Sequence, residues 1–469
     1  MAGIDKRLSS VELSEQLDMD QKQYSRYVCD SRAIPNIIDG LKPVQRRILW
    51  TMWNSSARDH FTKTVKVAGM VMGYHPHGNT SIEDAIAQMT QNFPFANNYP
   101  LILGEGVFGD VLDPKAIASP RYTEVKLSDF AKDLGLFEAL EDIDYVSNYD
   151  ESAKEPIYFV PKVPLVLLNP ILGIATGFKC YMPQRKLEDV ITVLLNVLHG
   201  KARASKKNID PWVRDYYGAH HTVVNEHHMR VFVTGFGFER TKDGKIYLIA
   251  APHNFNREKT ILYLEELIKE HGDILRDYED YSSDRFKIEL LFKRGKRITD
   301  NVLTSLFTKE TRDIIDQNVI TSSGHLKNRT DGEIIEEFLA VRKMHLKRRF
   351  ARLQRLAEEK CAKENELIRF ITEKWNEKVI LTSSRQALKT ALEKAKFVYM
   401  DWLVSLPIYR LTKQEVNRSK EAIIEAKKQV LYYKRLKENK RSLDQFIETE
   451  INALLKKWKY IPAKYQDQH

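Results

Sequence analysis

The sequence predicts a multidomain protein of the α+β class. Its 469 residues exceed the length of one ordinary domain. Hydrophobic residues make up 43% and aromatic residues 10%, enough to bury several cores, while 29% charged residues exclude global disorder and a membrane-embedded fold. Three patterns follow one another along the chain: short helices, strands alternating with helices, and heptad repeats. We therefore expect domains of three kinds.

Short helices dominate residues 12–91. Pro43 can open a first helix, and a second helix covers residues 63–72. A turn rich in Gly, Pro and His precedes a third helix, which Thr80 or Ser81 caps. Three short helices in succession are typical of a helix-turn-helix DNA reader, although this spacing alone is not specific.

The middle of the chain, residues 155–330, alternates strands with helices. Runs rich in Val, Ile and aromatic residues predict strands at 158–168, 229–234, 246–250 and 286–292. Amphipathic patterns predict helices between them, at 187–198 and 259–268. We expect one α+β domain here.

Beyond residue 332 the strand patterns stop and heptads begin. Leucines recur at multiples of seven, with Lys360 breaking the series, at positions 339, 346, 353 and 367. The same spacing returns at Val416, Ile423 and Val430. At 1.5 Å per residue, a helix over 333–374 would extend roughly 60 Å. Because residues 379–410 must reverse the chain, an antiparallel helix pair is favoured over a parallel zipper.

The net charge of +10 is unevenly distributed. Residues 331–469 carry 31 basic and 20 acidic side chains, whereas residues 1–330 carry 43 and 44. Inside the neutral part, residues 41–70 hold six basic side chains and one acidic one, and residues 129–155 are mostly acidic. Only the basic cluster is suited to follow a phosphate backbone.

Other features exclude several protein classes. No apolar run approaches the roughly 18 residues that a membrane span needs, and residues 1–10 lack the apolar core of a secretory signal. Three distant cysteines, Cys29, Cys180 and Cys361, exclude a disulfide scaffold and a cysteine-rich zinc module. We expect a protein of the reducing cytoplasm with no membrane partner.

Three motifs are weaker than they first look. The Gly104–Gly109 segment matches a dinucleotide fingerprint, but no βαβ repeat surrounds it, so a close-turning loop is preferred. No Walker loop occurs, so no ATP-hydrolysing site is expected in this chain. The histidines of residues 220–228 and the pair Asp142 and Asp144 could hold a metal; an exposed loop and a solvated acidic face are preferred, and no metal site is predicted.

Tyr122 is a candidate nucleophile. A phenol has a pKa of about 10, so it attacks phosphodiesters only where cations stabilise the phenolate and the phosphate. Arg121 precedes it directly, and His75 and His77 lie on a proline-restrained loop that can add proton donors. By spacing alone, Tyr122 is more often a packed or surface aromatic residue.

Four motifs in one order within residues 32–124 change that interpretation: Arg32-Ala33-Ile34-Pro35-Asn36-Ile37-Ile38-Asp39-Gly40-Leu41-Lys42-Pro43-Val44-Gln45-Arg46-Arg47, Tyr74-His75-Pro76-His77-Gly78, Gly104-Glu105-Gly106-Val107-Phe108-Gly109 and Arg121-Tyr122-Thr123-Glu124. The set resembles the breakage-reunion subunit of type IIA DNA topoisomerases (gyrase A-like). In length, the chain is most similar to the medium subunit of T-even-type phage topoisomerases. Residues 168–177 resemble the loop of the family's DNA-intercalating isoleucine, and residues 280–285 resemble its tower segment.

The resemblance implies a detailed domain order. An N-terminal arm helix would occupy residues 1–30, and a winged-helix (helix-turn-helix-like) DNA-gate domain with the catalytic tyrosine would occupy 31–155. An α/β tower domain would follow at 156–330. Long antiparallel coiled-coil arms would cover 331–378 and 412–469, with a C-gate globule at 379–411.

The resemblance also implies roles for individual residues. Tyr122 would form a 5′-phosphotyrosyl link to DNA on each protomer of a homodimer, so that a second duplex can pass. Arg121 and His77 would stabilise charge on the phosphate. DNA binding would involve Arg32, Lys42, Arg46, Arg47, His75 and Ile174, the last as a wedge between base pairs. Thr80 and Asp84 fall on the helix that contacts quinolone drugs in the family, while Gln45, Asn79 and Val107 depart from its pattern.

The implied activity needs partner subunits. The chain would be the DNA-cleaving and religating subunit of an ATP-dependent type II topoisomerase, an isomerase that relaxes or decatenates double-stranded DNA during replication. Mg²⁺ would be held by a partner's TOPRIM domain and ATP by a partner's ATPase domain. With the sequence ending at His469, no DNA-wrapping domain is expected. The setting would be a bacterial or phage-infected host cytoplasm, at the nucleoid.

Two other functions remain open from the residues. One is a non-enzymatic coiled-coil DNA-binding protein in which Tyr122 is structural. The other is a tyrosine recombinase, which uses the same nucleophile without ATP or Mg²⁺.

Overall fold

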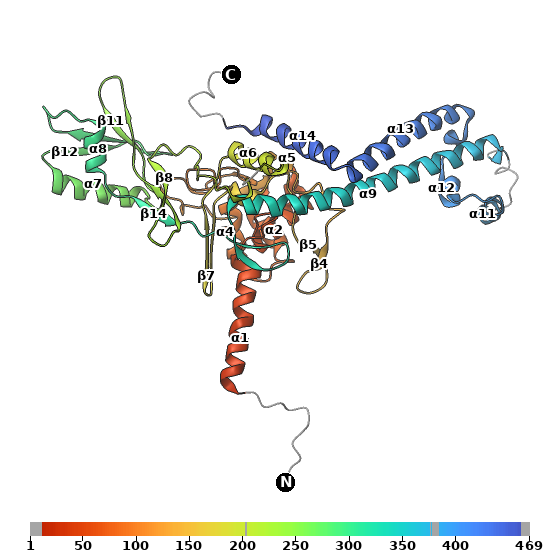
Figure 1. Ribbon diagram of the computed structural model, residues 1–469, viewed down its shortest axis with the longest axis horizontal. Coiled ribbons are helices and arrows are strands. Elements are labelled where there is room, and N and C mark those ends of the chain that lie inside the picture. The colour runs from red at the N-terminus through yellow and green to blue at the C-terminus, as the bar shows by residue number, and fades with distance from the viewer. Residues whose placement is uncertain (1–11, 202–203, 376, 378–383, 461–469) are drawn as a thin grey trace, which may run out of the picture. The chain divides into compact units, whose positions relative to one another are not determined.

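The computed structural model describes residues 12–201, 204–375, 377 and 384–460 (Figure 1). The chain forms two compact units. The first comprises Met1–Arg342 with Thr449–His469, and the second comprises Lys343–Glu448. Helices and open sheets are both present, so the fold is of the mixed α and β kind that the sequence predicts. Among the described residues, no helix is both long enough and apolar enough to cross a membrane.

The first unit begins with the predicted helices. The exposed helix α1 extends away from the rest of this unit (Figure 1). At the start of α2, the Lys42 amide donates to Gln45 Oε1 at 3.0 Å, which caps the helix. A small antiparallel sheet, in the order β1-β3-β2, lies beside these helices. The elements are α1 (Leu13–Val28), η1 (Cys29–Ala33), α2 (Pro43–Trp53), η2 (Ser56–Arg58), β1 (Thr62–Lys63), α3 (Thr64–Val71), α4 (Asn79–Thr90), β2 (Ile102–Glu105), β3 (Glu124–Leu127) and α5 (Asp129–Asp133).

The segment that follows differs from prediction. Residues 158–168 do not form a strand, although their apolar run predicted one. Pro161 and Pro164 have no amide hydrogen to give a ladder, and the Phe159 amide bonds to the Asp39 side chain instead. The nearby elements are β4 (Tyr145–Ser147), β5 (Lys154–Pro156), η3 (Leu165–Leu167), β6 (Ile171–Ala175), β7 (Phe178–Met182) and α6 (Leu187–Leu198).

Among the remaining described strands of the first unit, those at 230–234, 246–250 and 288–292 match predicted runs, and six further strands were not predicted. A four-stranded antiparallel sheet has the order β10-β11-β13-β12, and a three-stranded sheet has the order β14-β9-β8. The core of the larger sheet contains Leu248, Leu264 and Ile288. The elements are η4 (Ala204–Lys206), β8 (His220–Val224), β9 (Arg230–Thr234), β10 (Gly237–Arg240), β11 (Ile246–Ala250), α7 (Arg257–His271), β12 (Leu275–Asp280), β13 (Ile288–Phe292), α8 (Asp300–Leu306), β14 (Thr311–Ile314), β15 (Asn318–Ile320) and β16 (Leu326–Asn328).

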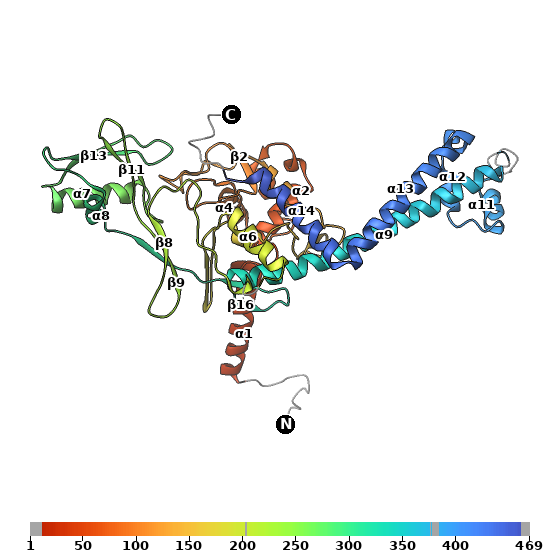
Figure 2. The ribbon, with the colours of Figure 1, turned by 45° about the horizontal axis from the view of Figure 1, so that its top comes forward.

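The second unit is built on a long helix pair, and α13 runs beside α9 in both ribbon views (Figures 1 and 2). Ser419 donates to Glu364 at 2.6 Å, and Lys437 donates to Gln354 at 2.9 Å. Because partner numbers rise along one helix as they fall along the other, the pair is antiparallel. The helices are α9 (Asp331–Thr372) and α13 (Lys413–Glu438).

The returning arm is not one continuous helix. Asn439 is extended, with φ −100° and ψ 111°, and ends α13 before α14 (Lys440–Trp458). Between the arms, a small core includes Leu367, Leu392 and Leu403, from α9 and the elements α11 (Arg385–Lys394), α12 (Met400–Ser405) and η5 (Ile408–Leu411). Residues 378–383 and 461–469 of the predicted domains, like residues 1–11, lie outside the described part.

The buried carboxylate of Asp331 joins distant parts of the first unit at the start of α9. Its side chain is fully buried and meets the fully buried guanidinium of Arg185 at 3.3 Å. Gln317 Nε2 donates to it at 2.5 Å, and the Ile209 amide donates at 2.7 Å. Burial lowers the pKa of Arg185, opposed by the Asp331 charge. A buried cation of this kind needs its anion.

Replacing Asp331 with Asn should therefore destabilise the first unit by about 3–5 kcal/mol, because Arg185 would be left buried without a counter-charge. Asp210→Asn is the matched control: Asp210 meets Arg230 at 3.5 Å but its side chain is 88% exposed, so a loss under about 1 kcal/mol is expected. Urea unfolding of the two variants checks this, and equal losses would contradict it.

Candidate active site

Tyr122 lies on a turn that leads into β3. Its side chain is 68% exposed, and its amide donates to the Ser119 carbonyl at 2.8 Å. The Arg121 guanidinium carbon lies 4.9 Å from the centre of the Tyr122 ring. Among the described residues, no carboxylate is within ion-pair distance of Arg121. The turn thus presents a phenol and an unneutralised guanidinium together at the surface.

The start of α3 fixes the backbone on both sides of Tyr122. The Thr64 amide donates to the Thr123 carbonyl at 3.0 Å, and the Val65 amide donates to the Pro120 carbonyl at 3.2 Å. The hydroxyls of Thr64 and Thr123, both buried, lie 2.8 Å apart. The nucleophile candidate therefore stands on a backbone with little freedom to shift.

The glycine loop at residues 104–109 packs against this turn. Gly106 has φ +105°, and a Cβ at this position would meet Thr123 Cγ2 at 3.1 Å. The Ala118 amide donates to the Val107 carbonyl at 3.0 Å. The loop therefore turns closely beside the tyrosine, which is the alternative that the sequence favoured over a dinucleotide site.

His75 and His77 form a second group. Their rings lie 4.7 Å apart, edge to face. His75 is buried, and its Nδ1 lies 3.0 Å from Arg47 Nη1. Because a guanidinium only donates, His75 Nδ1 accepts and its proton sits on Nε2. Burial and the nearby charges of Arg47, His77 and Arg32 lower the pKa of His75 to about 4. His75 is therefore neutral at pH 7.

His77 is exposed, and its Nε2 lies 3.0 Å from the hydroxyl of Tyr27, which belongs to α1. Tyr27 was not among the predicted site residues, and no sequence spacing points to it. Among the described residues, no hydrogen bond or ring contact joins Tyr122 to either histidine. The predicted catalytic residues thus occupy two groups within one chain: Arg121 with Tyr122, and His77 beside the predicted DNA-binding residue His75.

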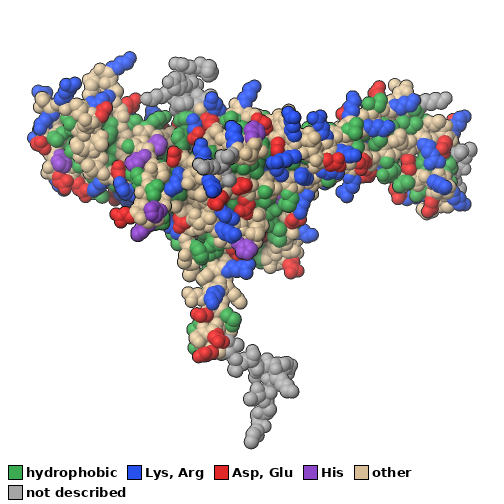
Figure 3. All heavy atoms as spheres, viewed as in Figure 1, with side chains coloured by type: hydrophobic (Ala, Val, Ile, Leu, Met, Phe, Trp, Pro, Cys, Tyr) green, Lys and Arg blue, Asp and Glu red, His purple; other side chains and the backbone are tan. Residues whose placement is uncertain are grey.

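Two of the predicted DNA-binding arginines are paired with carboxylates. Arg46 donates to both oxygens of the fully buried Asp39, at 2.6 and 2.9 Å. Arg47 donates to both oxygens of Glu155, at 2.7 and 2.8 Å. These partners lie outside the basic window of residues 41–70, and so does Glu124, which pairs with Lys63 at 2.8 Å. Most of the local positive charge counted in the sequence is therefore neutralised by the fold. Over the face drawn in Figure 3, basic and acidic side chains are intermingled.

The predicted wedge residue is at the surface. Ile174 lies in the β6–β7 hairpin and is 75% exposed. The Lys42 ammonium donates to the Leu172 carbonyl of the same hairpin at 2.6 Å, and burial lowers the Lys42 pKa. Arg32 is exposed, as are Thr80 and Asp84, which lie four residues apart on α4.

A metal site is not formed by the described residues. No group of three or more His, Cys, Asp or Glu side chains among them is arranged to hold an ion. The histidines of residues 220–228 lie on β8 and in the turn after it. His220, at the start of β8, bonds through Nδ1 to the Gly218 carbonyl.

The low pKa of His75 predicts a loss of stability in acid. A histidine whose folded pKa of about 4 lies below its unfolded value of about 6.5 binds a proton more tightly when unfolded. Stability should therefore fall as pH drops from 6.5 towards 4, by about 2 kcal/mol from this group. Urea unfolding at pH 6.5 and 4.5 of wild type and His75→Asn checks this. An unchanged pH dependence in the variant would contradict it.

The Arg46–Asp39 pair predicts that Arg46→Ala lowers stability by about 3–5 kcal/mol, because the carboxylate is fully buried. Lys66→Ala, which removes an exposed cation of α3, is the control and should change stability by no more than about 0.5 kcal/mol. Thermal unfolding and the salt dependence of DNA binding are measured together. A stable Arg46→Ala with a reduced salt slope would make Arg46 a phosphate-binding residue instead.

Comparison with known proteins agrees with the motifs. A family model that describes the A subunit of DNA gyrase/topoisomerase IV matches residues 32–452. The DNA gyrase A subunit of Campylobacter jejuni is 31% identical over 323 residues, covering 66% of this chain and 37% of that protein. The DNA topoisomerase 4 A subunit of Salmonella typhimurium is 29% identical over 395 residues (79% and 51%). Its counterpart in Haemophilus influenzae is 28% identical over 465 residues (93% and 60%).

The alignment extends from the first predicted motif through the heptad arms. This chain spans between 37% and 60% of the length of these three relatives. Because the family model covers most of the residues of this chain, the family is established: the chain belongs to the family of DNA gyrase and topoisomerase IV A subunits.

Proposed function

We propose that this chain is the DNA-cleaving and religating subunit of an ATP-dependent type II DNA topoisomerase. The observation that carries the proposal is the exposed Tyr122 beside the unneutralised Arg121, on a backbone fixed from both sides. Its exposure leaves the hydroxyl open to a substrate, and the fixed backbone limits its movement. Its place in the family's motif order supports the same role.

In the proposed reaction, the Tyr122 hydroxyl oxygen attacks a DNA phosphorus atom and loses its proton. The bond between phosphorus and the 3′ oxygen breaks, and the 3′ oxygen takes up a proton to become a free hydroxyl. The product is a 5′-phosphotyrosyl link, so one phosphodiester bond is exchanged for another and no ATP is needed for this step. Reversal reseals the strand after a second duplex has passed.

The cations have separate tasks in this proposal. Arg121 is positioned to stabilise the phenolate and the negative charge on the attacked phosphate. His77 is exposed and can donate a proton or a hydrogen bond to the phosphate, with Tyr27 orienting its ring. Arg46 and Arg47, held by Asp39 and Glu155, would act mainly by supporting α2 and His75. The exposed Arg32 completes the proposed phosphate-binding surface, to which the buried and neutral His75 would contribute its Nε2 hydrogen.

Ile174 is proposed to insert between base pairs and bend the cleaved duplex. Its 75% exposure on a two-stranded hairpin suits a wedge, and inserted apolar side chains kink DNA in other proteins. Thr80 and Asp84, both exposed on α4, are the proposed drug contacts.

The proposed activity requires an assembly. We propose a homodimer of this subunit, so that each protomer cleaves one strand of the duplex. Mg²⁺ would be held by the TOPRIM domain of a partner, and ATP would be bound by a partner's ATPase domain. Within the family, we propose that this chain is most closely related to the medium subunit of T-even-type phage topoisomerases. Native mass spectrometry of the isolated complex tests these partners directly.

The nucleophile assignment predicts that Tyr122→Phe abolishes covalent adducts with DNA, because the attacking oxygen is gone. Wild type and variant, each assembled with the partner subunits, are incubated with duplex DNA and Mg²⁺ and quenched with detergent, and adducts are counted. Tyr149→Phe, which alters another exposed tyrosine (58%), is the control and should form adducts at the wild-type level.

Three outcomes would contradict the proposal. Adducts formed by Tyr122→Phe would place the nucleophile elsewhere. DNA binding by wild type with no adduct would favour a non-enzymatic DNA-binding protein. Metal-independent cleavage at a single sequence would favour a recombinase.

A further inference from the structure

The hairpin that carries Ile174 is only partly packed: Ile171, Cys180, Tyr181 and Met182 are buried, whereas three of its apolar side chains face solvent. Besides Ile174, it exposes 57% of Leu172 and 48% of Phe178. The hairpin is a two-stranded sheet, β6 with β7, and isolated two-stranded hairpins are marginally stable in water. A wedge must resist the cost of unstacking bases, which is a few kcal/mol per step. Groups outside the hairpin must therefore hold it in place.

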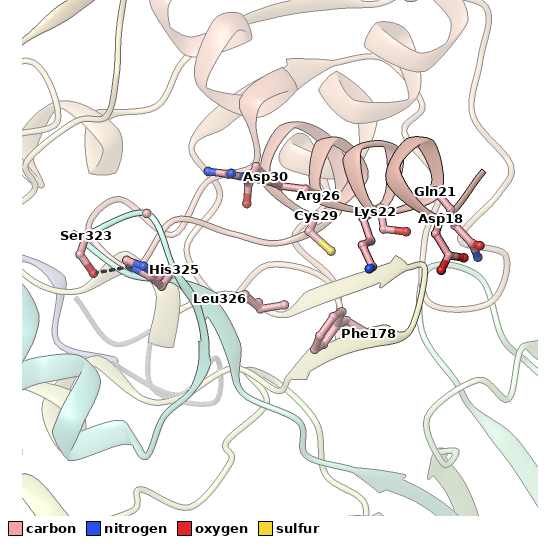
Figure 4. A pocket seen from close by; sticks show the side chains of 12 residues that line it. Asp18, Gln21, Lys22, Arg26, Cys29, Asp30, Phe178, Ser323, His325 and Leu326 are labelled. Atoms are coloured by element: carbon pink, nitrogen blue, oxygen red, sulfur yellow. Dashed lines mark hydrogen bonds and ion pairs between the residues drawn. The ribbon is translucent and has the colours of Figure 1, made fainter. Parts of the chain in front are cut away.

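One side of the hairpin faces a cavity. Phe178 lines a hollow of about 690 Å³ together with residues of α1 and with Ser323, His325 and Leu326 of the β15–β16 hairpin (Figure 4). The hollow leaves Phe178, at the start of β7, with few van der Waals partners on that side. Hydrogen bonds are therefore expected to help fix the exposed part of the hairpin, in addition to the packing of the buried Cys180 and Met182.

Two side chains from distant segments bond to the hairpin backbone. Lys42 donates to the Leu172 carbonyl in β6. Asn318 Nδ2 donates to the Lys179 carbonyl in β7 at 2.6 Å, and Lys179 is the cross-strand neighbour of Ile174. The bond from Asn318 thus reaches the residue directly opposite the proposed wedge.

Asn318 is itself held in one orientation. Its Nδ2 also donates to Asp316 Oδ1 at 2.9 Å, and Asn328 Nδ2 donates to the same oxygen at 2.8 Å. Since both contacts of Asn318 Nδ2 are to acceptors, its amide nitrogen and oxygen are distinguished. Burial raises the pKa of Asp316, while Asn328 and the charge of Lys179 oppose this.

The strand that carries Asn318 is anchored to the backbone before α2. The Ile37 amide donates to the Ile320 carbonyl at 2.9 Å, and the Ile320 amide donates to the Pro35 carbonyl at 3.0 Å. Val319, which directly precedes Ile320, is fully buried. Asp316 and Tyr181 exchange two backbone bonds of 2.9 Å, so the strand is also joined to β7.

We propose that Asn318 is a positioning residue for DNA bending: its bond to the Lys179 carbonyl fixes the strand opposite Ile174 and so holds the wedge at its working angle. This inference rests on the proposed role of Ile174. Loss of one such hydrogen bond typically shifts an equilibrium by roughly 2- to 10-fold. Asn318→Ala should lower the ratio of bent to unbent DNA by that factor and leave affinity within about 2-fold.

The test uses the full chain with its partner subunits and a short duplex labelled at both ends. End-to-end energy transfer reports bending, and titration of the same duplex reports affinity. Ile174→Ala, Asn318→Ala and the control Asn328→Ala are compared. Asn328 donates to the same Asp316 oxygen and, at 3.4 Å, to Asn318 Oδ1, but it donates to no hairpin carbonyl. Because Asn328→Ala keeps the bond from Asn318 to the Lys179 carbonyl, it should bend DNA to within about 2-fold of wild type.

A second measurement does not depend on DNA. Hydrogen exchange of residues 171–182 should be faster in Asn318→Ala than in wild type, with little change in β10–β13, because the hairpin loses its support. If Asn318→Ala fails to fold, Asn318→Ser is used, because its hydroxyl is too short to reach both acceptors. The same loss of bending is expected.

The outcomes separate the two proposals. Normal bending by Asn318→Ala, with bending lost in Ile174→Ala, overturns the role of Asn318 and leaves the wedge intact. Normal bending by Ile174→Ala overturns the wedge and, with it, this inference. Equal loss of bending in Asn318→Ala and Asn328→Ala would mean general weakening of the β15–β16 sheet, and it would also overturn the specific role of Asn318.

Discussion

The buried carboxylate of Asp331 is the contact on which much of the first unit depends. It neutralises the buried Arg185, accepts from Gln317 and the Ile209 amide, and begins the long helix α9. Gln317 directly precedes Asn318, so the same buried anion that compensates a charge also fixes the start of β15. The contact that compensates a buried charge therefore also positions β15, whose Asn318 bonds to the hairpin of Ile174.

The positive charges of the N-terminal region serve different purposes despite their similar sequence context. Arg46 and Arg47 meet carboxylates from other segments, and Lys42 binds a backbone carbonyl. Arg121 differs from these three, because it lies over the exposed Tyr122 ring and no described carboxylate is in ion-pair range. Its guanidinium is therefore available to the phosphate in the proposed reaction.

Prediction from the sequence succeeded where the signal is local. Periodicity gave α2, α6, α7 and α9, and alternation gave β9, β11 and β13, because backbone propensity and side-chain pattern agree there. It failed for residues 158–168, where an apolar run is buried as irregular chain. Pro161 and Pro164 cannot complete a ladder, and apolar runs alone do not distinguish a strand from other buried segments. Tyr27 and Glu155 were missed because their partners are distant in sequence, and Asp39 was missed because no spacing pattern pairs it with Arg46.

By itself, the sequence determined the family, through four motifs in a fixed order, and with it the candidate nucleophile Tyr122. It also determined the antiparallel helix pair, since the heptads repeat on both sides of a segment that reverses the chain. Only the tertiary structure decided which cations are free. A count of charges over neighbouring residues cannot include carboxylates that are distant in sequence but close in the fold, such as Glu155 beside Arg47. The support of Ile174 by Asn318 was likewise beyond the sequence, because 139 residues separate Asn318 from the Lys179 carbonyl that it binds.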